Sequence, residues 1–508
     1  MKKTKVRSLL TRLACSVAAL LLVSSICVAQ SDTARIEGTV TDSSGAVVVG
    51  AKVVAENVAT GIKTEAESNA EGLYVLTPLR IGTYKLEISA NGFRKVSKPD
   101  ITLEVNQIAK IDVALEAGSV DEVVQITGGA PLVETSTSSL GQVINGRDIV
   151  ELPLNGRNFT QLATLTPGVT RGTLGGNADG SQGNAETFRQ GDTGSAALSV
   201  NGLREQNNNF QLDGIDNNES IVNTIVFFPP VEALQEFKVI TNVAPAEFGR
   251  AGGAVVNAVI KSGTNGFHGS AFEFIRNSAL DARPAFSPTK PVFIRNQFGF
   301  TFGGPIVKDK TFFFMDFQGL RQRLPIEAGN LITVPTAQMR MGDFSQLLNP
   351  NFTGLGQPVT IYNPNTGQPF PNNVINIPTN QTAMNYLNSF PLPDLDRARQ
   401  NFFVKRLQRQ SFNDGDVRID HRISDKDSIF GRFSIANDPE TDPGRIPGFQ
   451  AGFGAGTNQI DAKSIAGTYT RTFNATVVNE FRFGWVKDNT QFLPVGFGTN
   501  QDAALGVG

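Results

Sequence analysis

The chain has 508 residues, of which 40% are hydrophobic and 18% are charged, and its formal net charge is −2. A charge this close to neutral argues against a nucleic-acid partner, and a chain of this length is expected to hold several domains. After the N-terminal segment, no stretch is apolar enough to form a membrane-spanning helix.

The N-terminus has the three parts of a secretory signal peptide. Five basic residues up to Arg12 precede the apolar run 13–23, and Cys27-Val28-Ala29 offers small residues where cleavage requires them. The apolar run is shorter than the about 20 residues that a membrane-spanning helix needs. We therefore predict a signal peptide over residues 1–29. Because Cys15 and Cys27 are the only cysteines, the exported chain has no disulfide to stabilise it.

Residues 34–116 have the pattern of a small β-sandwich, with short alternating strands at 35–40, 51–55 and 84–88 separated by turn residues. The spacing Gly38-x-Val-x-Asp-x-x-Gly45, followed by Gly72-x-Tyr and Gly82-x-Tyr, resembles the carboxypeptidase-regulatory-like (transthyretin-like) domain. No peptidase activity is implied, because the chain has no His-Glu-x-x-His and only two histidines. The resemblance leaves two roles open, a structural spacer or a weak glycan-binding module.

Residues 117–133 form a linker that carries a short acidic and then β-branched segment. A segment of this type can add as an extra strand to the sheet edge of a partner. It resembles the energy-coupling box of TonB-dependent receptors, although a linker strand of the sandwich would have the same pattern. The partner-binding residues predicted on this basis are Asp121, Glu122, Val123, Val124, Gln125, Ile126 and Thr127.

Residues 134–261 resemble the plug domain of the same receptors. The resemblance rests on residues 145–159, 198–204, 211–216 and 246–265, which occur in the order of the family. Together with the preceding sandwich, they resemble the Oar-like subgroup. Asparagine and aspartate near tight turns are expected in any β protein, so plain loops remain the alternative to a substrate contact. The candidates that face substrate on this view are Asn207, Asn208, Asn209, Asp213, Asp216 and Asn217.

Residues 262–508 alternate apolar and polar side chains in short segments without a helix between them. In Gln297-Phe298-Gly299-Phe300-Thr301-Phe302 every second residue is phenylalanine, so one face of a strand is aromatic. Charged residues from Asp416 to Arg422 and at Glu480 and Arg482 suit a wet barrel interior, with the apolar set facing lipid. Seven strands are predicted, at 267–276, 295–303, 311–319, 416–423, 428–436, 464–471 and 480–487.

The connections between these strands alternate in length. Those at 304–310, 424–427 and 472–479 are short, and those at 277–294, 320–415 and 437–463 are long. Short periplasmic turns and long outer loops are typical of outer-membrane barrels. Seven strands cannot close such a barrel, so we expect the chain to be the N-terminal part of a longer protein. The predicted fold is mainly β: an N-terminal β-sandwich, an α+β plug domain, and the first strands of an incomplete antiparallel barrel.

The leading functional hypothesis is an outer-membrane TonB-dependent receptor that takes up a solute, with the sandwich and linker in the periplasm. By resemblance, its partners are a TonB-type inner-membrane energy transducer, outer-membrane lipid, and an unknown small solute, oligosaccharide or peptide. No catalytic set, metal cluster or cofactor motif is expected. Two alternatives remain: a surface adhesion or secretion platform, and an exported carbohydrate-binding protein based on the sandwich.

Overall fold

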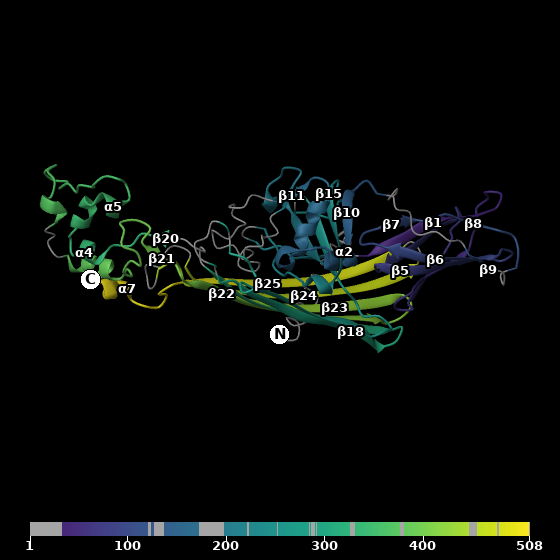
Figure 1. The fold of residues 1–508 in the computed structure, drawn as a ribbon. Helices are drawn as coiled ribbons and strands as arrows, with labels where there is room; N and C mark the ends of the chain where they lie inside the picture. The colour runs from purple at the N-terminus through teal and green to yellow at the C-terminus, as the bar shows by residue number, and fades with distance from the viewer. Residues whose placement is uncertain are drawn as a thin grey trace, which may run out of the picture.

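The computed structural model (Figure 1) describes residues 33–506, except 120–122, 126–136, 172–197, 221–222, 251, 284, 286–289, 291, 326–330, 376–379, 447–454 and 475–476. The predicted signal peptide lies outside the described residues. Long strands run beneath a central domain, with a sandwich beyond one end of them and a small helical module beyond the other. In the part of the chain described here, every helix is too short or too polar to cross a membrane.

The N-terminal domain consists of two sheets that enclose one apolar core. Inward residues alternate with outward ones, and Ile36, Leu76, Leu86 and Ile88 are almost fully buried. One sheet contains β1 (Ala34–Asp42), β4 (Leu73–Leu79), β7 (Ile108–Lys110) and β8 (Val113–Leu115). The other has the order β3 (Lys63–Glu67), β2 (Lys52–Asn57), β5 (Gly82–Ser89), β6 (Lys95–Leu103) and β9 (Val123–Gln125).

The central domain, called the plug below, is a mixed sheet covered by short helices. Its order is β10 (Leu140–Asn145), β15 (Leu234–Asn242), β16 (Val255–Ile260), β13 (Asn209–Leu212) and β14 (Ile215–Asp216). A separate pair joins β11 (Val169–Arg171) and β12 (Leu198–Val200). The helices are α2 (Gly146–Glu151), η2 (Asn155–Arg157), η3 (Phe159–Leu165), η5 (Glu205–Asn207) and η6 (Val231–Ala233). The Asn145 side chain caps α2 by accepting from the Asp148 amide at 3.0 Å.

The third domain is a seven-stranded antiparallel sheet, called the wall, in which each described strand pairs with the next along the chain. The strands are β17 (His268–Asn277), β18 (Ile294–Val307), β19 (Thr311–Pro325), β22 (Leu407–Arg422), β23 (Asp427–Asp442), β24 (Gly456–Asn474) and β25 (Val477–Pro494). All seven predicted strands are present, most of them longer than expected, and the described sheet is not closed. The predicted fold class is therefore confirmed.

The two faces of the wall differ as the alternation predicts. Val417, Ile419 and Phe433 are exposed on the outer face, whereas Asp416 and Arg418 are buried on the inner face. Not every phenylalanine of the wall lies on its outer, lipid-facing side. The inward positions of β19 include Phe312 and Phe314, which are at most 1% exposed, and Phe314 belongs to the apolar core of the plug. Plug and wall therefore share one core.

The long connection after β19 forms an ordered module at the end of the wall opposite the sandwich (Figure 1). This outer module, residues 331–406, buries the side chains of Val334, Phe352 and Val404. Asn401 fixes the base of the module. The side-chain NH2 group of Asn401 donates to the Val334 carbonyl at 2.9 Å, and its side-chain oxygen accepts from the main-chain amide of Val334 at 2.8 Å. Its elements are β20 (Leu331–Ile332), α4 (Ala337–Arg340), η7 (Ser345–Leu348), α5 (Pro350–Thr353), η8 (Pro371–Asn373), α6 (Gln381–Asn388) and β21 (Phe402–Phe403).

A last helix, α7 (Gln501–Leu505), follows β25 and lies against this module, since Asn385 donates to the Leu505 carbonyl at 3.1 Å. The predicted long connection at 437–463 is mostly strand, because β23 extends to Asp442 and β24 begins at Gly456.

Candidate functional site

Asp213 joins the plug to the wall. It sits in the turn between β13 and β14, where Asp213 and Gly214 have φ of 52° and 69°, a geometry that suits an Asp-Gly hairpin turn. The turn directs the carboxylate toward the wall, and the side chain is completely buried. Its Oδ1 accepts from the Ile260 amide at 3.0 Å and from Arg418 at 2.9 Å, and its Oδ2 lies 2.7 Å from Nε of Arg432.

The two arginines face each other across neighbouring strands. Arg418 of β22 and Arg432 of β23 are direct register partners, and their side chains are 5% and 1% exposed. Like charges at directly opposed positions destabilise a sheet, so this part of the wall requires an anion between them. Asp213 of the plug supplies that anion. The wall therefore carries a binding position for the plug that is built from two strands.

Further carboxylates extend this contact in both directions. Asp420 of β22 lies 3.2 Å from Nε of Arg418, and Asp416 lies 3.3 Å from Nη1 of Arg432. Asp420 also pairs with Arg80 of the sandwich, which reaches it from the turn between β4 and β5. A buried ionic row thus runs from the sandwich through the wall to the plug. Removing one member of a buried ion pair leaves the other charge uncompensated, so a single substitution in this row is expected to destabilise the contact.

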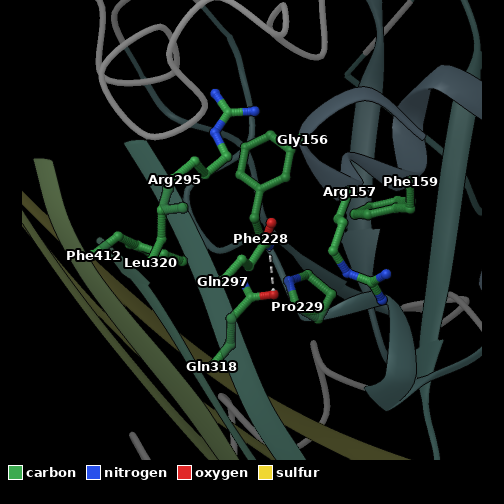
Figure 2. Close-up of a pocket in the computed structure, with 10 residues that line it drawn as sticks. All are labelled: Gly156, Arg157, Phe159, Phe228, Pro229, Arg295, Gln297, Gln318, Leu320 and Phe412. Carbon is green, nitrogen blue, oxygen red and sulfur yellow. Dashed lines mark hydrogen bonds between the residues drawn. The ribbon is translucent and has the colours of Figure 1, made fainter. Parts of the chain in front are cut away.

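A second contact lies at the crevice between plug and wall shown in Figure 2. Arg157 of η2 pairs with Glu232 within the plug, and its guanidinium lies 4.0 Å from the ring centre of Phe274 on β17. The nearby wall residues Gln297 and Gln318 are joined by a hydrogen bond of 2.9 Å. The remaining cavity is about 20 Å³, which is room for about one water molecule. Here the plug fits closely against the wall.

The residues predicted to face substrate have two kinds of environment. Asn208, Asn209, Asp213 and Asn217 are at most 5% exposed. The side chains of Asn208 and Asn209 donate to main-chain carbonyls of the plug, those of Leu198 at 2.7 Å and Gly249 at 3.1 Å. The Asn217 side chain donates to the Phe227 carbonyl at 2.8 Å and accepts from the Phe227 amide at 3.0 Å. These four hold the plug together or bind it to the wall.

The other two candidates are more accessible. Asn207 is half-buried in η5, and Asp216 is 55% exposed, with its carboxylate 2.7 Å from Arg250. Contact of any of the six with a solute stays a prediction.

The predicted coupling segment is described in part. Val123, Val124 and Gln125 form β9, which pairs in parallel with Lys95–Ser97 of β6 at the edge of the sandwich. Asp121, Glu122, Ile126 and Thr127 lie outside the described residues. The segment is thus able to form a strand and, at its described residues, does so with the sandwich. Binding to an energy transducer stays a prediction.

Two members of the ionic row, Arg80 and Arg432, were not named from the sequence. Arg418 was predicted to lie in the barrel interior, but without a partner. The one clue in the sequence was Leu212-Asp213-Gly214, because an acidic residue next to an apolar strand needs a cation partner when the strand end is buried.

Two protein-family models match parts of the chain. Residues 35–116 match the carboxypeptidase regulatory-like domain, and residues 259–508 match the outer membrane beta barrel domain. The TonB-dependent transporter Oar of Myxococcus xanthus is 28% identical over 319 residues, which is 59% of this chain. The chain spans 28% of the length of that curated relative.

Two solved structures are similar to the chain over a comparable extent. The siderophore receptor PirA from Acinetobacter baumannii has 15% identity and a TM-score of 0.42, covering 71% of this chain and 41% of its own. The outer membrane transporter YddB from Escherichia coli has 13% identity and a TM-score of 0.43, covering 69% and 39%. The barrel domain match and the relationship to Oar locate the protein in the outer membrane. The chain is thus a homologue of the TonB-dependent transporter Oar, with a carboxypeptidase regulatory-like domain ahead of an outer membrane β-barrel domain.

Proposed function

We propose that the protein takes up a solute across the outer membrane and that the plug must be displaced for the solute to pass. The observation that carries the proposal is the plug contact itself. Asp213 is fully buried between Arg418 and Arg432, and plug and wall share an apolar core. Separating them exposes buried charge and apolar surface, so displacement needs work. The outer membrane has no nucleotide supply, and the work therefore comes from a partner in the inner membrane.

The partner is a TonB-type energy transducer that pairs with the segment from Asp121 to Thr127 as an added strand. The support is that Val123–Gln125 already has strand geometry at the edge of a sheet. An edge strand presents unpaired N–H and C=O groups to a second chain, and backbone pairing then provides the affinity. The transported solute is a small molecule, an oligosaccharide or a peptide.

Deletion of residues 121–127 tests the coupling. We expect uptake to be lost while membrane insertion and solute binding are kept, and a scrambled segment of the same composition serves as the control for length. Val124→Pro is the finer variant, because proline removes a backbone donor that strand pairing uses, and Val124→Ala is its matched control. Uptake that continues unchanged in the deletion variant would contradict the assignment.

A surface adhesion platform is the second candidate function, and the ordered outer module favours it. Its base is held by two hydrogen bonds between Asn401 and Val334, and Val334, Phe352 and Val404 are buried, so the module presents a fixed surface, which a passive loop does not. Replacing residues 326–406 by a short turn distinguishes the two functions. Loss of attachment with unchanged uptake would assign adhesion to the module, and loss of solute binding would assign it to transport.

A further inference from the structure

We propose that the N-terminal sandwich is a gate seated on the short-turn end of the wall, and that Arg80 is the positioning residue through which its departure loosens the plug. The gate rests on the proposed transport function, whereas the link from Arg80 to the plug can be measured without transport.

The sandwich is held at the short turns of the wall. In the loop 58–62, between β2 and β3, the Ala59 carbonyl accepts a hydrogen bond from the main-chain amide of Asn265 at 2.9 Å. The carbonyl of Lys63, the first residue of β3, accepts from Arg422 at the end of β22 at 3.0 Å. Asn265 is itself tied to Asp309, in the turn between β18 and β19, at 2.6 Å. The seat is therefore formed by the ends of wall strands that short turns connect.

The sandwich also contacts the plug. The Val105 amide donates to the carboxylate of Glu236 on β15, and Asn257 of β16 donates to Asn106 at 2.9 Å. A cavity of about 490 Å³ remains between sandwich, plug and wall. A solute that passes the plug would enter this space and meet the sandwich.

The seat can open without disrupting either core. The apolar core of the sandwich contains no residue of plug or wall, and the core shared by plug and wall contains none of the sandwich. The contacts named above between the sandwich and the other two domains are hydrogen bonds and one ion pair. Interfaces of this polar kind permit relative domain motion. The plug, by contrast, cannot leave the wall without exposing apolar surface.

The ionic row transmits the state of the seat to the plug. Asp420 is shared by Arg80, Arg418 and the Ser262 hydroxyl, and Arg418 is in turn shared by Asp420 and Asp213. When Arg80 leaves, Asp420 keeps a single cation partner and attracts Arg418 more strongly, since the interaction is little screened inside the protein. The contact between Arg418 and Asp213 then weakens.

The position of Arg80 is fixed from within the sandwich. The hydroxyl of Tyr84 donates to the Arg80 carbonyl at 2.8 Å. Burial raises the pKa of Tyr84 to about 12, so this donor stays protonated. The side chain of Arg80 is 33% exposed, while that of Asp420 is 2% exposed. Movement of the sandwich therefore withdraws a charge from a buried carboxylate.

The coupling segment is attached closer to the sandwich than to the plug. Gly118 donates to Gly92 at 3.1 Å, and β9, which begins at Val123, pairs with β6. Between β9 and β10 of the plug the chain continues for residues 126–139. A pull on Asp121 to Thr127 therefore acts on the sandwich first, and the sandwich leaves its seat before the plug moves.

Hydrogen exchange of the plug in the intact protein tests the link. We expect Arg80→Ala to accelerate exchange of the amides of β16 about five- to tenfold, which corresponds to the loss of one partly exposed ionic contact. Arg80→Lys should restore most of the protection. Arg35→Ala is the matched control, because Arg35 pairs with Glu37 at 3.1 Å inside the sandwich. Equal exchange in Arg80→Ala and Arg35→Ala would overturn the role of Arg80.

A disulfide across the seat tests the gate. Ala59→Cys with Asn265→Cys would join two residues whose main chains are hydrogen-bonded, in a chain with no cysteine after the signal peptide. We expect oxidation to abolish uptake, reduction to restore it, and solute binding to persist in both states. Lys52→Cys with Glu67→Cys, a pair within the sandwich, is the control.

Uptake that continues with the seat closed would overturn the gate. Absence of uptake in the unmodified protein would refute the transport function instead, and the exchange rates would still decide the link from Arg80 to the plug.

Discussion

Replacing Asp213 by asparagine should loosen the plug by removing the charge between two buried arginines. The asparagine oxygen can still accept from the Ile260 amide, so the variant isolates the charge. Removing one partner of a buried ion pair costs about 3–5 kcal/mol. Arg418 keeps Asp420 and Arg432 keeps Asp416, so the lower limit of about 3 kcal/mol applies. This predicts an increase in plug opening of roughly 150-fold.

Hydrogen exchange of β16 measures that opening, because the Ile260 amide is one of its reporters. Asp216→Asn, in strand β14 after the same turn, is the matched control. Its ion pair with Arg250 is about half exposed on both sides and is expected to contribute about 0.5 kcal/mol or less. If Asp213→Asn and Asp216→Asn exchange at the same rate, the buried row does not hold the plug, and the proposed mechanism of release is wrong.

Three other substitutions test separate parts of the molecule. Burial raises the pKa of Glu236 from 4.5 to about 7, so between these pH values the carboxyl group is protonated in the folded protein and ionised in the unfolded chain. The free energy of unfolding should therefore fall as the pH rises from 4.5 to about 7, by up to about 1.4 kcal/mol per pH unit. Glu236→Gln should flatten this pH dependence, measured by urea titration at several pH values. Gly299→Ala should lower the yield of folded wall in heat-modifiability gels, because its Cβ would lie 2.2 Å from a carbonyl oxygen of β19, whereas Gly431→Ala, with its nearest neighbour at 4.0 Å, should fold normally. Phe433→Lys on the lipid face should destabilise the inserted protein by about 2–4 kcal/mol in urea unfolding from lipid, and an unchanged midpoint would place this residue outside the lipid band.

The strands of the wall were predictable because their two faces differ in hydrophobicity. Val417 and Ile419 alternate with Asp416 and Arg418, and a period of two identifies a strand without any knowledge of its neighbours. The outer ends of β23 and β24 were missed because the outward face of each strand is polar there, as at Asn437 and Asp461, and the alternation is lost. These segments are strands because they extend paired neighbours, as in the pairing of Asn437 with Asp461. Pairing of this kind depends on the neighbouring strand and cannot be recognised from the local sequence.

The candidate site was predictable only in part, for a related reason. The turn at Asp213 is a local signal, whereas its partner Arg418 is 205 residues away in sequence. Likewise, the strand propensity of Val123 and Val124 was visible in the sequence, but not that β6 would be the partner. Sequence patterns report what a residue does within its own element. The charge partners that join sandwich, wall and plug arise only when the chain is folded.

The polar outer ends of β23 and β24 determine how far the protein reaches from the cell. The apolar outer face ends near Ile435, whose register partner is Lys463, and β24 continues outward from there to Gly456. At about 3.3 Å per residue and a tilt of about 40°, that extension raises the strand ends about 18 Å above the hydrocarbon layer. The outer module connects the neighbouring strands β19 and β22 and lies beyond the strand ends. A large object such as an antibody therefore meets the module before it meets the lipid.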